Sequence, residues 1–270
     1  MAWTREEMAQ RAEERLFIEQ GVRRAIDQQQ LELHYQPIFD LATGRMVAAE
    51  ALVRWRHPEL GLIPPDRFIP IAEAAGLIEP LGLWVLNQAC RDACNWQQSG
   101  QPPVQVAVNV SPRQCHNHNF DQMVAKALAE TGLDPGLLEL ELTESALQSS
   151  AEVQAMLGRL RALGIGLVID DFGTGYSCLS VLKGLPIQKL KIDRSFIQDV
   201  LDDSNSAVLA RIILAMGLNL GMKVIAEGIE TQAQFDWLLS HQCSHGQGYL
   251  LGRPQPLADF RHLLHPSLHH

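Results

Sequence analysis

The 270-residue sequence contains no uninterrupted apolar run of the ~18 residues that a membrane-spanning helix requires. Its longest candidate, residues 212–218, is flanked by Arg211 and Asn219, and the first ten residues lack the apolar stretch of a signal peptide. We therefore expect no membrane segment in this chain and a cytoplasmic location, although a longer parent protein could be anchored in a membrane elsewhere.

Positive charge is also scarce. The chain has 22 Lys and Arg against 31 Asp and Glu, which gives a formal net charge of −9 with neutral His. This balance opposes non-specific binding to nucleic acid or to an anionic membrane surface. It remains compatible with a small anionic ligand if metal ions mediate the binding.

The cysteines do not form the pattern of a secreted disulfide framework, because they are odd in number and irregularly spaced. They are Cys90, Cys94, Cys115, Cys178 and Cys243. Cys90 and Cys94 could share a helix face and bind metal, but no second Cys/His pair stands at zinc-finger spacing. Buried thiols in a reducing cytosol are the favoured interpretation.

The length and composition favour one large globular domain. With 46% apolar and 20% charged residues the chain can bury a core, and α/β barrels commonly use roughly 250 residues as a single unit. Residues 1–29 are expected to form a charged lead-in helix, 30–265 the domain, and 266–270 a tail. Two roles for the helix are equally weighted: covering the bottom of a barrel, or transmitting a signal from an upstream sensory domain.

Short β-rich runs alternate with helical stretches from residue 31 onward, which predicts a parallel sheet closed into a TIM-like (β/α)8 barrel. The turn-like segment at 40–44 joins the first two runs, so one antiparallel strand is expected near the start. The candidate strands are residues 31–39, 45–50, 104–109, 137–142, 166–170, 189–192, 223–227 and, more weakly, 246–250.

Polar residues lie at or near the ends of these predicted strands, where the active sites of barrels are built. A single carboxylate there is more often a helix cap, but several clustered carboxylates repel one another unless a cation compensates. The residues are Glu50, Asn109, Glu141, Asp170, Asp171, Lys191, Glu227 and Gln247.

The donor atoms in this set are oxygens, which suit Mg²⁺ or Mn²⁺ better than zinc. The number of carboxylates, including the adjacent pair Asp170 and Asp171, suggests two ions that clamp the attacking and leaving oxygens. Lys191 and Arg54 add positive charge near the same face. Phosphoryl chemistry is therefore favoured.

Taken together, the motifs resemble the EAL-domain family of cyclic di-GMP phosphodiesterases. Three residues, Glu50-Ala51-Leu52, would be weak evidence alone, but further motifs follow in the family's order. They are Tyr35-Gln36-Pro37-Ile38, Asn109-Val110-Ser111, Glu141-Leu142-Thr143-Glu144, Asp170-Asp171-Phe172-Gly173-Thr174-Gly175, Lys191-Ile192-Asp193, Glu227-Gly228-Ile229-Glu230 and Gly248-Tyr249-Leu250.

The resemblance implies an irregular barrel that hydrolyses cyclic di-GMP to linear pGpG, lowering a bacterial second messenger. It implies metal binding by Glu50, Asn109, Glu141, Asp170 and Asp171, with Glu227 a further ligand or the catalytic base. Lys191 would orient the attacking water. Substrate would be contacted by Gln36, Leu52, Arg54 and Gln247, the last ordering metal-bound water.

The resemblance also implies regulation and inhibition. Glu144 resembles the residue that anchors the loop around Gly173 and Gly175, a loop associated with the second metal and with coupling in a homodimer. An upstream sensory or GGDEF-type domain is expected in a longer parent chain. Activity should require Mg²⁺ or Mn²⁺ and be suppressed by Ca²⁺, which prefers longer and looser coordination.

Two other functions are compatible with parts of the pattern. The first is a module that senses cyclic di-GMP without cutting it, which the complete set of candidate ligands disfavours. The second is a glycoside hydrolase on a similar barrel, which needs only two carboxylates and leaves Asn109, Lys191 and the paired aspartates without a role.

Overall fold

A computed structural model describes residues 5–97, 103–147, 150–174 and 184–264, with side chains from Arg15 onward. The other residues, including Cys178 and the expected tail 266–270, lie outside the described ranges. Cys90, Cys94, Cys115 and Cys243 are free thiols, and three of these four are buried. Within the described ranges, every helix is too short or too polar to cross a membrane.

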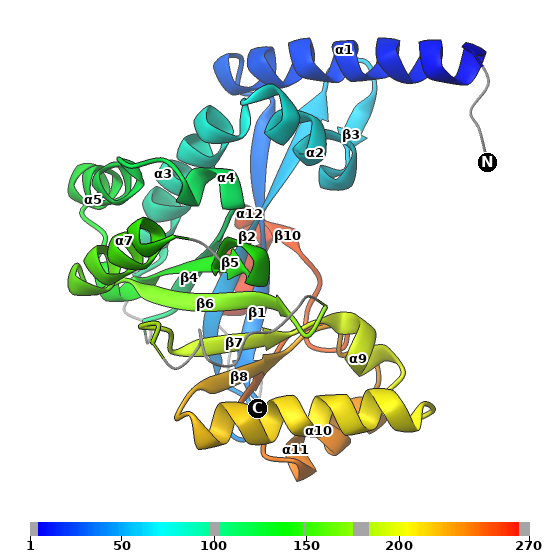
Figure 1. The fold of residues 1–270 in the computed structure, drawn as a ribbon, viewed down its shortest axis with the longest axis vertical. Coiled ribbons are helices and arrows are strands. Elements are labelled where there is room, and N and C mark those ends of the chain that lie inside the picture. The colour runs from blue at the N-terminus through cyan, green and yellow to red at the C-terminus, as the bar shows by residue number, and fades with distance from the viewer. Residues whose placement is uncertain (1–4, 98–102, 148–149, 175–183, 265–270) are drawn as a thin grey trace.

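Eight strands close into a barrel in the order β1-β9-β8-β7-β6-β5-β4-β2, with a β1–β2 pairing that completes the ring (Figure 1). The predicted TIM-like (β/α)8 architecture is thereby confirmed. The strands are β1 (Leu31–Asp40), β2 (Met46–His57), β4 (Gln105–Val110), β5 (Leu138–Thr143), β6 (Gly166–Phe172), β7 (Lys189–Ile192), β8 (Lys223–Ala226) and β9 (His245–Gly246).

The expected irregularity lies in β1, which is antiparallel to both of its barrel neighbours, β2 and β9. Its pairing with β2 places Gln36 opposite Glu50. A two-residue strand, β10 (Gln255–Pro256), also pairs with β1 outside the ring. The remaining neighbouring pairs in the ring are parallel, so their carboxyl ends meet at one end of the barrel.

Two strands differ from the predictions by more than two residues at one end, and the others agree within two residues. The second strand was expected to end at Glu50, but β2 continues to His57: it pairs with β4 only over Ala48–Ala51 and then leaves the barrel beside β1 and β3 (Gly61–Ile63). The weak strand at 246–250 is reduced to His245–Gly246. Gly248 packs so closely on Ile229 that a Cβ would lie 2.2 Å from its backbone, and the chain turns there.

Helices cover the outside of the barrel, and the largest apolar core lies between them and the strands. The long ones are α3 (Ile78–Gln97), α5 (Phe120–Thr131), α7 (Ala151–Ala162), α10 (Ser204–Asn219), α11 (Gln232–Ser240) and α12 (Leu257–Leu264). Shorter ones are α4 (Pro112–Cys115), η1 (Pro135–Leu137), α6 (Glu144–Leu147) and α9 (Arg194–Gln198).

A small apolar cluster fills the barrel interior, formed by Ile38, Ala48, Val168 and Ile225 with the partly buried Val47. Side chains alternate between the two faces of a strand, so residues two positions apart point to the same side, whichever way the strand runs. Gln36, Glu50, Asp170 and Glu227 stand in this relation to the four buried members. The interior therefore changes from apolar to acidic within one layer of residues toward the carboxyl ends.

A second core builds what we call the N-terminal lobe: α1 (Arg5–Asp27), α2 (Pro65–Ala75), β3, the outer ends of β1 and β2, and the start of α3. Val22 of α1 packs with Trp55 and Phe68 in this core, and a Cβ at Gly21 would lie 2.5 Å from the Trp55 ring. The lead-in helix forms, but of the two roles weighed for it, covering the barrel bottom is wrong, and transmitting a signal from an upstream domain stays a prediction. The helix lies over the extended ends of β1 and β2, on the carboxyl side (Figure 1).

Candidate active site

Lys191 of β7 occupies the centre of the acidic end of the barrel, with 1% of its surface exposed. Its Nζ lies within ion-pair distance of four carboxylates from four other strands or strand ends: Glu227 Oε1 at 2.6 Å, Glu141 Oε2 at 3.0 Å, Glu50 Oε2 at 3.1 Å and Asp170 Oδ1 at 3.4 Å. Burial disfavours the charged lysine, but these neighbours outweigh it and raise the pKa of Lys191 well above its usual value. Lys191 therefore remains charged.

Glu50 is held by two side-chain amides in addition to Lys191. Asn109 Nδ2 donates to Glu50 Oε1 at 2.7 Å, and Gln247 Nε2 donates to Glu50 Oε2 at 2.8 Å and to Glu227 Oε1 at 3.1 Å. Burial alone would raise the pKa of Glu50, but Lys191 and the two amides lower it overall. Glu50 is thus a fixed carboxylate at the level where β2 leaves the barrel.

Asp170 and Asp171 end on the same side of the chain although they are consecutive, whereas neighbours in a regular strand point to opposite faces. The difference arises because Asp171 has a φ of +53°, in the left-handed region, at a break in the register between β6 and β7. The Asp171 amide donates to Asp170 Oδ1 at 3.0 Å. This local turn delivers two carboxylates from one strand end.

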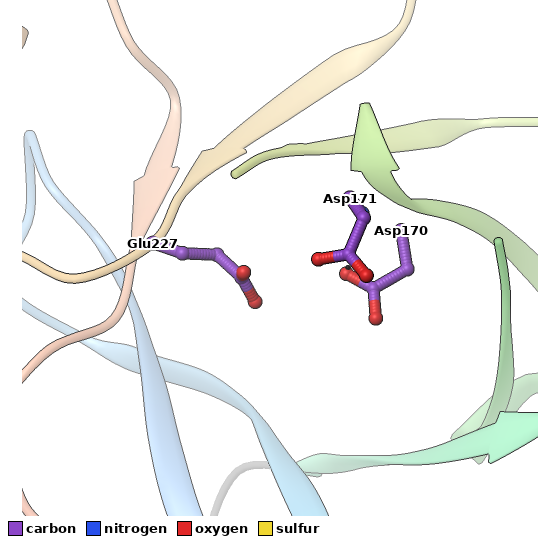
Figure 2. A group of neighbouring side chains, drawn as sticks. All are labelled: Asp170, Asp171 and Glu227. Atoms are coloured by element: carbon purple, nitrogen blue, oxygen red, sulfur yellow. Dashed lines mark hydrogen bonds between the residues drawn. The ribbon is translucent and has the colours of Figure 1, made fainter. Parts of the chain in front are cut away.

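Glu227 faces these aspartates from the end of β8, as Figure 2 shows. One oxygen from each of Asp170, Asp171 and Glu227 can be chosen so that all three lie within 4.8 Å of one another. This spacing allows one cation to contact all three residues. Neither cysteine nor histidine belongs to the group, which agrees with the oxygen-donor chemistry expected from the sequence.

The protein's own cations do not balance the charge of this cluster. Burial is the largest cause and the charge of Asp170 the second in raising the pKa of Asp171 to about 6. Burial also raises the pKa of Glu227 to about 8, although Lys191 acts in the opposite direction. The pKa of Glu141 is likewise raised well above its usual value, chiefly by burial. Glu141 Oε1 and Gln247 Oε1 are buried without a hydrogen-bond partner among the described residues. Orphaned oxygens beside excess carboxylates fit a divalent metal site.

A groove of about 460 Å³ adjoins the cluster, and we call it the lobe groove because it lies between the N-terminal lobe and the barrel. The predicted substrate residues Leu52 and Arg54 line it, as do Asn109 and Asp171. Arg54 donates from Nη1 to its neighbour's carbonyl, Val53 O, at 2.9 Å, and has no carboxylate within 4.0 Å in the described ranges. Burial lowers the pKa of Arg54, yet the group stays cationic and is open to an anion.

Gln36 lies beside the cluster and not in the lobe groove. It is buried, and its Nε2 donates to Gly252 O at 3.1 Å, which ties the turn after Gln247 to β1. Its predicted contact with the ligand remains a prediction.

Glu144 is the one predicted site residue that the structure keeps outside this arrangement. It begins α6 and is buried, and neither carboxylate oxygen has a hydrogen-bond partner among the described residues. The described part of the loop, Asp171–Thr174, makes no hydrogen bond to it, and Gly175 lies outside the described ranges. Its role as loop anchor remains a prediction.

One further carboxylate near the cluster was missing from the predicted site. Asp193 follows β7 at the N-cap of α9 and accepts from the Ser195 amide at 3.0 Å. It is also among the groups that raise the pKa of Asp171, after burial and Asp170. Its position two residues after Lys191 was the available signal, because alternate residues of a strand share a face.

Comparisons with known proteins converge on one family. The family model described as EAL domain matches residues 19–254. Among curated proteins of Pseudomonas aeruginosa, the cyclic di-GMP phosphodiesterase NbdA is 46% identical over 94% of this chain, and the bifunctional diguanylate cyclase/cyclic di-GMP phosphodiesterase MucR is 44% identical over 91%. These alignments cover 33% and 36% of the two relatives, so the chain spans about a third of their length.

A solved structure supports the same grouping. The MucR phosphodiesterase in complex with c-di-GMP superposes with a TM-score of 0.87, at 43% sequence identity, covering 90% of this chain and 99% of that one. The EAL enzyme Bd1971, bound to cAMP and cyclic di-GMP, gives a TM-score of 0.89 at 33% identity, covering 94% and 69%.

Proposed function

The chain belongs to the EAL-domain family, and from this membership we propose that it hydrolyses cyclic di-GMP to linear pGpG, lowering a second messenger of bacterial signalling. The observation that carries the proposal is the complete oxygen-donor cluster around Lys191. A module that only bound the nucleotide would not need so many buried, mutually repelling carboxylates.

Metal binding is proposed for Glu50, Asn109, Glu141, Asp170 and Asp171, with Glu227 as a further ligand or base. Two Mg²⁺ or Mn²⁺ ions, when bound, would supply activation of water and stabilisation of the leaving oxygen. Ca²⁺ should inhibit, because its larger radius and looser coordination misfit a site shaped for the smaller ions.

The chain's own residues would orient the water, accept its proton and bind the substrate. Lys191 orients the attacking water and offsets negative charge that develops on the phosphoryl group. If it acts as the base and not as a ligand, Glu227 would accept the proton from that water, because burial raises its pKa to about 8 and so increases its affinity for a proton. Arg54 holds a substrate phosphate, and Leu52 contacts the ligand in the lobe groove. Gln36 faces the ligand at the edge of the pocket, and Gln247 orders water at the metal site.

The partners are proposals of the same kind. A homodimer is supported by α10, whose Val208, Leu209 and Ile212 are exposed on the outside of the barrel (Figure 1). An upstream sensory or GGDEF-type domain is supported by the relatives, which are about three times as long as the matched region. We also propose a cytoplasmic location. The proposed division of the chain is a lead-in helix at 1–29, the domain at 30–265 and a tail at 266–270.

Incubation with cyclic di-GMP and Mg²⁺, followed by chromatography of the guanine nucleotides, tests the proposal. We expect pGpG from the wild-type protein and none from Glu141→Gln, which removes one carboxylate charge at nearly constant volume. Tight binding of cyclic di-GMP without product would indicate that the protein is a sensor module and not an enzyme. Neither binding nor product would exclude both.

A further inference from the structure

The lobe groove has two edges, which are joined by α3. Pro65, Asp66, Ile69 and Glu73 on one edge belong to α2 of the N-terminal lobe. On the other edge, Asn109 and Thr143 lie at the ends of β4 and β5, and Ser111 directly follows β4. The first turns of α3 belong to the lobe core and its later turns to the barrel core, whereas the described residues of α2 pack only in the lobe core. Apolar packing therefore does not join α2 directly to the barrel edge of the groove.

Glu73 makes two polar contacts across this junction, and Glu79 at the start of α3 accepts another from Asn117 Nδ2 at 3.2 Å. The Ser111 hydroxyl donates to Glu73 Oε1 at 2.6 Å, and Arg113 Nη1 donates to the Glu73 carbonyl at 2.9 Å. Glu73 thus binds the barrel through both its side chain and its backbone, near the end of α2. We call these two contacts the Glu73 clasp.

The barrel side of the clasp is rigid and close to the metal cluster. Ser111 stands two residues after Asn109 and is the N-cap of α4, where it forms a capping box with Gln114. Gln114 packs so tightly on Gly82 of α3 that a Cβ there would lie 2.2 Å from its Nε2. Ser111 is therefore part of a fixed turn, whereas α2 packs through Phe68 and Ala72 in the lobe core and reaches this turn through Glu73.

We propose that Glu73 is a positioning residue whose clasp to Ser111 and Arg113 sets the width of the lobe groove and thereby the affinity for the cyclic dinucleotide. The inference rests on the proposed function, since it concerns how that site receives its substrate. Glu73 makes no contact with the metal cluster among the described residues, so the clasp governs binding and leaves the chemical step to Lys191 and its neighbours.

The experiment compares Glu73→Ala, Glu73→Gln, Ser111→Ala and the double alanine variant. We expect Glu73→Ala and Ser111→Ala to raise KM for cyclic di-GMP about 10-fold, the effect of losing one charge-assisted hydrogen bond, with kcat little changed. Glu73→Gln keeps an acceptor for the Ser111 hydroxyl and should restore most of the affinity. The double variant should be no worse than either single one, because both remove the same bond.

A second substrate separates positioning from general damage. Bis(p-nitrophenyl) phosphate is a small phosphodiester that does not span the groove, so its turnover with Mn²⁺ should match wild type in all four variants. Unchanged KM for cyclic di-GMP in Glu73→Ala, an equal loss on the small substrate, or failure of Glu73→Gln to restore affinity would each overturn the clasp. If the wild-type protein binds cyclic di-GMP without cutting it, the proposed function fails alone, and Kd measured by calorimetry tests the clasp in place of KM.

Discussion

Nζ of Lys191 lies 2.6 Å from Oε1 of Glu227, and Gln247 donates to that same oxygen at 3.1 Å. One carboxylate oxygen is therefore shared between a cation and an amide at the meeting point of β7, β8 and the segment after β9. The lysine offsets part of the negative charge in this arrangement, and divalent ions would offset the rest when bound. Its removal should affect both the chemistry and the stability of the protein.

Lys191→Ala should lower kcat for cyclic di-GMP by about 100-fold or more, because a preorganised cation near the reacting phosphoryl group is lost. Arg54 remains in the groove, so Kd should change far less than kcat. Steady-state kinetics and calorimetry separate the two quantities. Lys223→Ala, at an exposed position on β8, is the control and should behave as wild type. Unchanged turnover in Lys191→Ala would show that its role is misassigned.

Metal addition should stabilise the folded protein, since ions that bind only the native carboxylate cluster shift the unfolding equilibrium. Thermal unfolding should move to higher temperature with increasing Mg²⁺ or Mn²⁺, and the shift should disappear in Asp170→Asn.

Hydrolysis should also depend on the metal. Exhaustive chelation should abolish hydrolysis, re-addition of Mg²⁺ should restore it, and Ca²⁺ should suppress it. Full activity after chelation is incompatible with the proposed chemistry.

Glu144→Ala should lower turnover by on the order of 100-fold although Glu144 lies outside the cluster, because a displacement of about 1 Å at a reacting group has that effect. Its two buried oxygens lack partners among the described residues, and the predicted loop contact would offset the cost of burying them. Turnover, Mg²⁺ dependence and sedimentation should all change. Wild-type values in the three measurements would leave Glu144 without the predicted anchoring role.

His245 should make stability fall as the pH drops from about 6.5 to about 4. Burial, assisted by Lys189 and Lys223 and opposed by Asp40, lowers the pKa of His245 from 6.5 to about 4. The unfolded chain therefore binds a proton in this window that the folded protein does not, at up to about 1.4 kcal/mol per pH unit. The full contribution is present above pH 6.5.

Urea denaturation between pH 4 and pH 7 measures this dependence. His245→Gln should flatten the curve in that window, whereas His118→Gln, at an exposed position, should not. Parallel curves for His245→Gln and the wild-type protein would assign the acid sensitivity to other groups.

The sequence predicted best where local pattern and tertiary position agree. Strand β7 was predicted at its exact residues because Leu190 and Lys191 belong to a short run that is followed at once by the polar residues Asp193 and Arg194. Glu50 was placed correctly near the site although its strand end was wrong. The reason is that β2 continues outside the barrel, where it pairs with β1 and β3 and its side chains no longer follow the barrel's alternation.

Residues brought to the site by packing between elements were beyond sequence patterns. Glu73 lies in the last turns of an amphipathic helix, and the sequence pattern there indicates an ordinary exposed carboxylate. In the structure, the packing of α2 places its side chain against Ser111. The left-handed Asp171 could not be recognised from its residue type alone. The positive φ of Asp171 occurs at the break in pairing between β6 and β7, which the sequence does not show.

The two separate apolar cores make the N-terminal lobe a candidate for independent opening in hydrogen exchange. Amide protection should be lower in α1 and α2 than in β5 and β7, because the lobe buries a smaller core than the barrel. A ligand seated in the groove would touch both bodies and bind only when both are folded. Cyclic dinucleotide should then slow hydrogen exchange in α2 more than in the barrel strands. The increase in protection of α2 would measure how far the bound ligand raises the free energy of opening the lobe.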